Sequence, residues 1–202
     1  TTLTGLTASP HTFAVTPTIS TTYSLVSVAS ATCSSGSVGG SATITVTPIT
    51  GNPATFGTDT WIGYVYDDAG DATPLPGRIN FAGAKYRGFI RESDIPGYNT
   101  TTDAFDFNLG TNPISGANIC GSYANDFSVR YRMRKNFPAG IYRFSVGSDD
   151  GVRLLVNGTN VITDPTAFNT HPYTVYTSAP VCLSAGNQDL VIEYYERGGN
   201  SR

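Results

Sequence analysis

The chain has 202 residues, of which 13% are charged, and its formal net charge at pH 7 is −3. Proteins that bind nucleic acid need a basic surface, so this balance argues against a nucleic-acid partner. No apolar run approaches the roughly 20 residues that cross a bilayer, so no membrane span is expected. The 12 Tyr and 10 Phe, together with sparse charge and abundant Thr and Ser, favour an all-β extracellular protein.

The first part of the chain differs in composition from the rest. Short alternating runs at residues 11–16, 23–28 and 41–47 predict three strands, separated by turn-forming Pro, Ser and Gly. Residues 47–60 have the composition of a linker. We therefore expect two regions, residues 1–50 and residues 51–202.

In the second region, strand patterns alternate with Gly-rich and Asn-rich segments. We expect strands at residues 61–66, 88–91, 105–109, 127–133, 173–176, 180–183 and 189–195. On the strand at 127–133, apolar residues alternate with Arg130 and Arg132, and Arg134 follows. This basic side is either an anion-binding face or a solvated strand face with basic gatekeepers.

An acidic cluster follows the strand at 61–66. Asp67, Asp68 and Asp71 lie within five residues of one another. They indicate either a solvated hairpin loop or a secondary Ca²⁺ loop, although the spacing does not match that of an EF-hand.

A second acidic sequence, Asp149-Asp150, lies at the centre of residues 141–158. Apolar alternation on both sides predicts a hairpin, with the two aspartates at its solvent-facing turn. Adjacent carboxylates repel each other, whereas Ca²⁺ prefers clustered oxygen ligands. The pair is therefore the first candidate for a functional site. The alternative is a purely structural turn in which both carboxylates accept backbone N–H groups.

Three cysteines, Cys33, Cys120 and Cys182, form no Cys-x-x-Cys pair, and with only two histidines a zinc site is not expected. In an oxidising compartment, an odd number suggests one disulfide and one thiol whose partner is missing. We predict the disulfide Cys120–Cys182, because both residues lie in the larger part of the chain.

Several of these motifs resemble those of a known family. The segments FSVRYRM, YRFSVGSDDGVRLLVNG and LVIEYYERGG, within residues 61–202, resemble a PA14 domain, the β-sandwich of bacterial toxins, glycosidases and adhesins. Residues 1–50 are similar to the closing half of an immunoglobulin-like repeat of bacterial surface proteins. The expected fold is thus an all-β, PA14-type β-sandwich with an N-terminal partial immunoglobulin-like β segment.

The resemblance also implies a site. In PA14 lectins the two adjacent aspartates are joined by a cis peptide bond and bind Ca²⁺, which in turn coordinates two neighbouring hydroxyls of a sugar. Here the metal ligands would be Asp149 and Asp150, with Gly199 and Asn200 from a second loop. Residues proposed to contact the sugar are Arg197, Gly198, Tyr173 and His171. Arg197 stands where lectin members often have Asn or Asp, and Arg cannot ligate a cation.

The resulting prediction is a calcium-dependent carbohydrate-binding module of a secreted or surface-anchored bacterial adhesin, present as a monomeric part of a longer chain. The alternative is a structural or protein-binding module of a large surface protein. A glycosidase needs two carboxylates on either side of a sugar. Asp149 with Glu193 or Glu196 would have to serve, and no motif supports either pair. No enzyme activity is therefore expected.

Overall fold

The structure is a computed structural model that describes residues 4–5, 10–17, 19–29, 32, 38–46, 51–95 and 104–202. The chain divides into two compact units, Thr1–Pro48 and Ile49–Arg202. This division lies close to the expected boundary between residues 50 and 51.

The smaller unit contains one described pair of strands. Strands β1 (Thr21–Ser24) and β2 (Ser41–Ile44) are antiparallel, with Thr22 opposite Thr43. The strand expected at residues 11–16 is wrong, because none of those residues is in a strand. Phe13 in that segment is 61% exposed, so little apolar surface is buried there to hold a strand in place. The immunoglobulin-like character of this unit stays a prediction.

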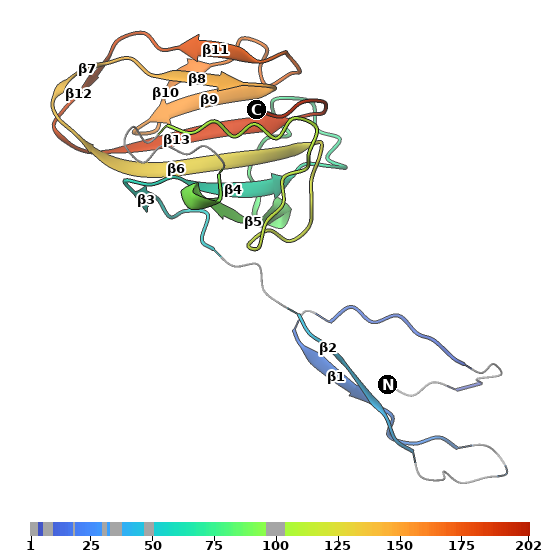
Figure 1. Ribbon diagram of the computed structural model, residues 1–202. Coiled ribbons are helices and arrows are strands. Elements are labelled where there is room, and N and C mark those ends of the chain that lie inside the picture. Colours follow the sequence, from blue (N-terminus) through green and yellow to red (C-terminus); the bar gives the residue numbers. More distant parts are fainter. Residues whose placement is uncertain are drawn as a thin grey trace. The chain divides into compact units, whose positions relative to one another are not determined.

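The larger unit has a seven-stranded sheet and a second layer of shorter strands. The large sheet contains β3 (Gly57–Thr58), β4 (Ile62–Asp67), β5 (Tyr86–Arg91), β6 (Phe127–Phe137), β9 (Gly151–Val156), β10 (Thr159–Thr163) and β13 (Gly186–Glu196). Its strand order is β10-β9-β13-β6-β4-β5, with β3 parallel to β6. The strands β9, β13, β6 and β4 follow one another from top to bottom in Figure 1.

The second layer consists of two antiparallel pairs. Strand β7 (Gly140–Tyr142) pairs with β12 (Val181–Leu183), and β8 (Ser145–Ser148) pairs with β11 (Thr174–Thr177). The described helical segments are two short 3₁₀ turns, η1 (Gly83–Lys85) and η2 (Glu92–Asp94). No helix of the described residues has the length and apolar character needed to cross a membrane. The expected all-β class and β-sandwich are therefore confirmed.

Strict alternation in β6 builds the core between the layers. Phe127, Val129, Tyr131 and Met133 are all buried in one cluster, and Tyr142 and Phe144 from the second layer pack against it. Burial of each such side chain stabilises the fold by about 1.5–3 kcal/mol. A second buried cluster covers the other face of the sheet, made of Tyr64, Tyr66, Ile79, Phe81, Tyr86, Phe168 and Tyr195. Because both faces are covered, residues 62–66 of β4 are apolar or aromatic without a break.

The expected hairpin around Asp149-Asp150 is wrong. Strand β8 pairs with β11, whereas β9 pairs with β10 and β13, so the two strands belong to different layers. Alternation predicts which face of a strand is buried, but two strands that cover one core from opposite sides give the same pattern. The two aspartates therefore form the corner at which the chain passes from one layer to the other.

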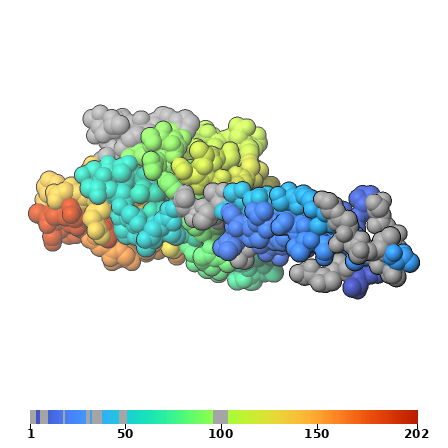
Figure 2. All heavy atoms as spheres, turned by 90° about the horizontal axis from the view of Figure 1, so that it is seen from below, coloured from blue at the N-terminus to red at the C-terminus, as the bar shows by residue number. Residues whose placement is uncertain are grey.

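The strand expected at residues 105–109 is also wrong. These residues are not in a strand, and Phe105 instead packs its ring against Trp61 and Tyr131, at centroid distances of 6.0 and 4.9 Å. Residues 104–126, which precede β6, form part of the surface of the larger unit (light green to yellow in Figure 2), while Ile114 and Ile119 within them are buried in its core. Side-chain packing thus fixes this segment where strand pairing does not.

The basic side of β6 is used for ion pairs within the sheet. Glu193 lies opposite Arg130 and accepts hydrogen bonds from both Arg130 and Arg153. Arg134 forms a two-bond pair with Asp189, with N–O distances of 2.6 and 2.9 Å. These contacts agree with a structural strand face.

The expected disulfide is wrong as well. Cys120 and Cys182 are free and exposed. Cys120 follows the bridge to β5, at one edge of the large sheet, whereas Cys182 pairs with Ile141 in the second layer. Occurrence in the same unit does not bring two cysteines within bonding distance. Cys33 lies outside the described residues.

Candidate functional site

The Asp149-Asp150 corner is fixed through its backbone. The peptide bond between the two residues is cis, as the resemblance implied. The Asp149 N–H donates to the Arg202 carbonyl oxygen at 2.9 Å, and the Arg202 N–H donates to the Asp149 carbonyl oxygen at 3.0 Å. The Tyr194 hydroxyl donates to that same Asp149 oxygen at 2.6 Å. Hydrogen bonds from Arg202 and from Tyr194 therefore fix the backbone that positions the Asp149 side chain.

Asp150 is buried, which corrects the expectation that both acids lie at a solvent-facing turn. Its side chain is 2% exposed. One carboxylate oxygen accepts the His171 N–H and the other accepts the Arg197 N–H, each at 3.0 Å. Asp150 thereby joins the loop before β11 to the loop after β13.

The glycine after the pair allows the loop before β11 to lie close. A Cβ atom at Gly151 would collide with the backbone of Phe168. The tight turn before His171 is organised by Asp164, which accepts N–H groups from Thr166 and Phe168. These contacts set the position from which the His171 N–H reaches Asp150.

Glu196 is a site residue that sequence reasoning did not assign. It is fully buried at the end of β13, and its Oε2 accepts the Tyr194 hydroxyl at 2.7 Å. Its Oε1 has no hydrogen-bond partner among the described residues. Burial raises the pKa of Glu196 to about 7, and repulsion from Asp150 and Asp149 adds to this shift, whereas hydrogen bonds from the Tyr194 hydroxyl and the Gly198 N–H oppose it. The spacing of Glu196 from Tyr194 on a strand, which puts both on one face, is the signal that could have found it.

Asp149 experiences the same crowding of negative charge. Burial, and next the charge of Asp150, raise the pKa of Asp149, while His171 and the Tyr173 N–H oppose this shift. Among the described residues, however, no group of three or more His, Cys, Asp or Glu side chains is arranged to hold a metal ion. A cation at this corner would therefore need main-chain or amide oxygens as well.

Such oxygens lie in the loop after β13. Gly199 and Asn200 are exposed, and Gly198 lies against Asn125, with 3.3 Å between its ideal Cβ position and Asn125 Oδ1. The loop is tied to the acidic corner at both ends, through Arg197 to Asp150 and through Arg202 to Asp149. The structure thus brings the second predicted loop beside the aspartates.

The two aromatic residues expected near the sugar differ in accessibility. The His171 side chain is 9% exposed, and its ring nitrogens lie 2.9 Å from the Pro172 carbonyl oxygen and 3.8 Å from Asp164. Tyr173 is 43% exposed, and the Arg202 guanidinium lies 4.2 Å from its ring centroid. His171 therefore contributes its backbone N–H to the corner, and Tyr173 keeps part of its ring accessible.

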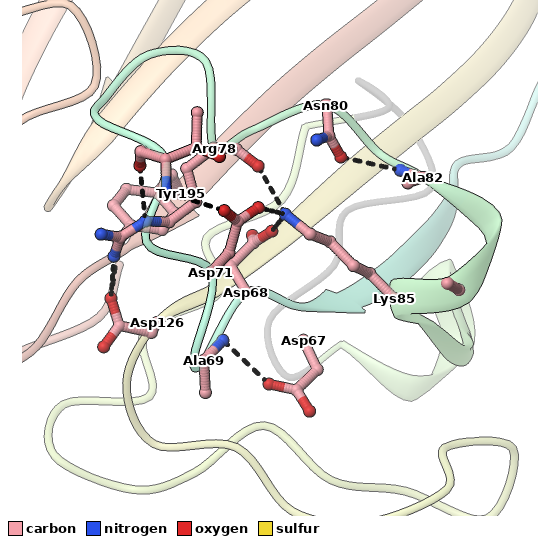
Figure 3. A network of polar contacts seen from close by, with 12 residues as sticks. Asp67, Asp68, Ala69, Asp71, Arg78, Asn80, Ala82, Lys85, Asp126 and Tyr195 are labelled. Atoms are coloured by element: carbon pink, nitrogen blue, oxygen red, sulfur yellow. Dashed lines mark hydrogen bonds and ion pairs between the residues drawn. The ribbon is translucent and has the colours of Figure 1, made fainter.

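The other acidic cluster is neutralised by a cation of the chain itself. Lys85 donates to Asp68 at 2.7 Å and to the Arg78 carbonyl oxygen at 2.6 Å, and its ammonium lies 2.6 Å from Asp71 (Figure 3). Lys85 thus occupies the position that a metal ion would take between these oxygens. This arrangement agrees with a structural loop.

We expect this cluster to contribute to the acid side of the stability profile. Hydrogen bonds from Lys85 and Thr73 hold the pKa of Asp71 well below its usual range. A folded pKa below the unfolded one stabilises the protein above about pH 4, and the contribution is lost as the pH falls further. The free energy of unfolding of Asp71→Asn, measured with urea from about pH 6 to pH 3, should therefore decline less steeply than that of the wild type. Parallel profiles would contradict this assignment.

The two carboxylate pairs considered for a glycosidase are not arranged for that role. Both oxygens of Glu193 are bonded to arginines on the outer side of the sheet. Glu196 is fully buried and bonded to Tyr194.

Several solved structures are similar in fold to this chain. A structure search finds the PA14 sugar-binding domain from an RTX adhesin, with a TM-score of 0.48 and 18% identity, covering 70% of this chain and 85% of that one. The chain is similar in fold to PA14 domains. The PA14 domain of the MpAFP antifreeze protein gives a TM-score of 0.41 and 18% identity, covering 77% of this chain and 84% of the other.

A third similarity is to an anti-sigma factor domain-containing protein, with a TM-score of 0.49 and 21% identity over 73% of this chain. This chain spans 41% of the length of that protein. At these identities the likeness to PA14 domains and to this protein concerns the fold alone. No protein-family model matches the sequence, and no curated protein matches it.

Proposed function

We propose that the larger unit is a calcium-dependent carbohydrate-binding module. The observation that carries the proposal is the Asp149-Asp150 corner, which backbone hydrogen bonds tie to the loop after β13 with its exposed residues Gly199 and Asn200. Burial, and next the charge of Asp150, raise the pKa of Asp149, which indicates an unfavourable negative potential at this corner of the sandwich. Bound cations relieve such a potential.

The donor set suits a hard cation. Ca²⁺ accepts six to eight oxygen ligands in flexible geometry. Asp149 and Asp150 would supply carboxylate oxygens, and the exposed loop residues Gly199 and Asn200 would supply main-chain and amide oxygens. When bound, such an ion offers remaining coordination positions to two neighbouring hydroxyls of a sugar.

The hydrogen bonds of Asp150 also favour a second candidate function, a structural or protein-binding module. Both of its carboxylate oxygens accept backbone N–H groups, as in a purely architectural turn. Each carboxylate oxygen has two lone pairs, however, so an accepted N–H leaves capacity for a metal. The architectural alternative leaves Oε1 of the buried Glu196 without a hydrogen-bond partner among the described residues.

The setting that accompanies this function is the surface of a bacterium. The module would belong to a secreted or surface-anchored adhesin, act as a monomer within a longer chain, and attach it to a cell-surface or polysaccharide glycan. The sequence resemblance to PA14 lectins at Asp149-Asp150 supports this setting.

A glycan array in calcium and in chelator tests the proposal. Wild-type protein should bind glycans on the array in calcium and should not bind them in chelator. Asp149→Asn should bind none in either condition, because the substitution keeps the side-chain shape but removes its charge. Asp189→Asn is the matched control, since this aspartate pairs with Arg134 on the other face of the sheet. Binding of the wild-type protein that is equal in calcium and in chelator, or that is absent in both, would contradict the proposal.

A further inference from the structure

Arg197 lies beside the acidic corner with an unusual set of partners. Its backbone N–H is bonded to Asp150, while its guanidinium donates to the neutral amide oxygen of Asn169 at 3.2 Å. Among the described residues it forms no ion pair with any carboxylate. Most other arginines of the unit do form one, namely Arg78, Arg87, Arg130, Arg134, Arg153 and Arg202.

The position of this arginine is the reason to assign it a role. Arg197 is exposed, and its loop is held between Asp150 and the Asp126 N–H, which donates to the Arg197 carbonyl oxygen at 3.4 Å. The guanidinium is therefore presented on a fixed loop and not on a free tail. It uses one of its five N–H donors on Asn169, so most of its hydrogen-bonding capacity remains.

Asn169 adds donors on the same side. Its Oδ1 accepts both the Arg197 guanidinium and the Thr170 N–H, which fixes the amide plane. Its Nδ2 makes no hydrogen bond with another described residue, and the residue is exposed. A fork of guanidinium donors next to an amide donor matches the oxygens of a carboxylate or sulfate.

We propose that the sugar bound at this corner is acidic, with its carboxylate or sulfate group held by the Arg197 guanidinium and the Asn169 amide. The inference rests on the proposed carbohydrate-binding function and names its ligand class. A positive side chain beside a cation site disfavours the cation through like-charge repulsion. An anionic ligand group between the two offsets that repulsion, whereas a neutral sugar does not.

Matched oligosaccharides test this ligand class by calorimetry in calcium. The set consists of a uronic-acid oligosaccharide, its carboxyl-reduced neutral form and a sulfated form of that neutral sugar. Wild-type protein should bind one of the two acidic forms at least about tenfold more tightly than the neutral form, and the difference should shrink at high salt. Tighter binding of the uronic or of the sulfated form identifies which anionic group is recognised.

Substitution of the arginine should remove this preference. In Arg197→Gln the ratio of acidic to neutral affinity should fall to about one, because the charge-assisted bonds are lost. Arg91→Gln is the matched control and should keep the wild-type ratio of affinities. Arg91 is also an exposed arginine, but it lies at the end of β5, which is the edge strand of the large sheet opposite β10. The NMR signal of the Arg197 Nε–H provides a readout apart from affinity and should shift when the acidic sugar is added.

The possible failures are distinguishable. Equal affinity for acidic and neutral sugars, or an unshifted Arg197 signal at saturation, would overturn the inference and leave the proposed function intact. If the wild-type protein binds none of the three sugars, both the inference and the proposed function are overturned. A preference for acidic sugar that persists in Arg197→Gln would assign the anion to other residues and so overturn the inference.

Discussion

Replacement of Asp150 by alanine is expected to abolish calcium-dependent glycan binding and to lower the free energy of unfolding by about 3 kcal/mol. The stability loss follows because the His171 and Arg197 N–H groups would lose their acceptor inside the fold. Each buried donor left unpaired costs about 1–3 kcal/mol. Urea denaturation, together with glycan binding in calcium, measures the two effects on one variant.

The neighbouring residue provides the control for this prediction. The bonds that hold Asp149 to Arg202 and Tyr194 use its main-chain atoms, which alanine retains. We therefore expect Asp149→Ala to lose glycan binding with a stability change of only about 1 kcal/mol, because alanine removes the contact of the carboxylate with the Tyr173 N–H but none of these main-chain bonds. Equal destabilisation by the two substitutions would contradict the different roles of the two aspartates.

Replacement of Glu193 by glutamine is expected to destabilise the fold by about 3 kcal/mol without a comparable change in glycan affinity. Glu193 is 3% exposed and is bonded to Arg130 and Arg153, which would then lose their only carboxylate partner among the described residues. Removal of one charge from a buried pair costs about 3–5 kcal/mol, and the partial exposure of the arginines places this case at the lower end.

A second ion pair on β13 serves as the comparison for Glu193. Asp189 pairs with Arg134, and the two side chains are 31% and 48% exposed. Asp189→Asn should cost no more than about 1 kcal/mol, as exposed pairs do. Thermal and urea unfolding of both variants check the contrast. Similar losses for Glu193→Gln and Asp189→Asn would contradict the view that burial decides the effect.

Long strands were predictable because their alternation persists over many residues. In β6, four apolar residues face the core and the arginines face the other side, as the pattern indicated. The partner of a strand was not predictable in the same way. β8 and β9 share a pattern and are adjacent in sequence, yet they pair with different strands, because alternation encodes burial and not the identity of the neighbour.

The site was predictable to the extent that it is local in sequence. The adjacent aspartates and the loop at residues 197–200 were found from motifs, and the structure places them side by side. Glu196 was missed as a member of the site because an acid at the end of a strand is usually exposed, although its spacing from Tyr194 places both residues on one face of β13. The pairing of Lys85 with Asp68 and Asp71 was missed for a similar reason, since it depends on how loops fold back.

Calcium titration by calorimetry tests the central claim most directly. For wild-type protein freed of metal, we predict binding of a single ion per chain with a dissociation constant of about 10⁻⁷ to 10⁻³ M, the range of sensor and extracellular calcium sites. The same titration of Asp149→Asn should give no binding heat in this range. Heat that is absent from the wild type, or unchanged in Asp149→Asn, would contradict a calcium site at the Asp149-Asp150 corner.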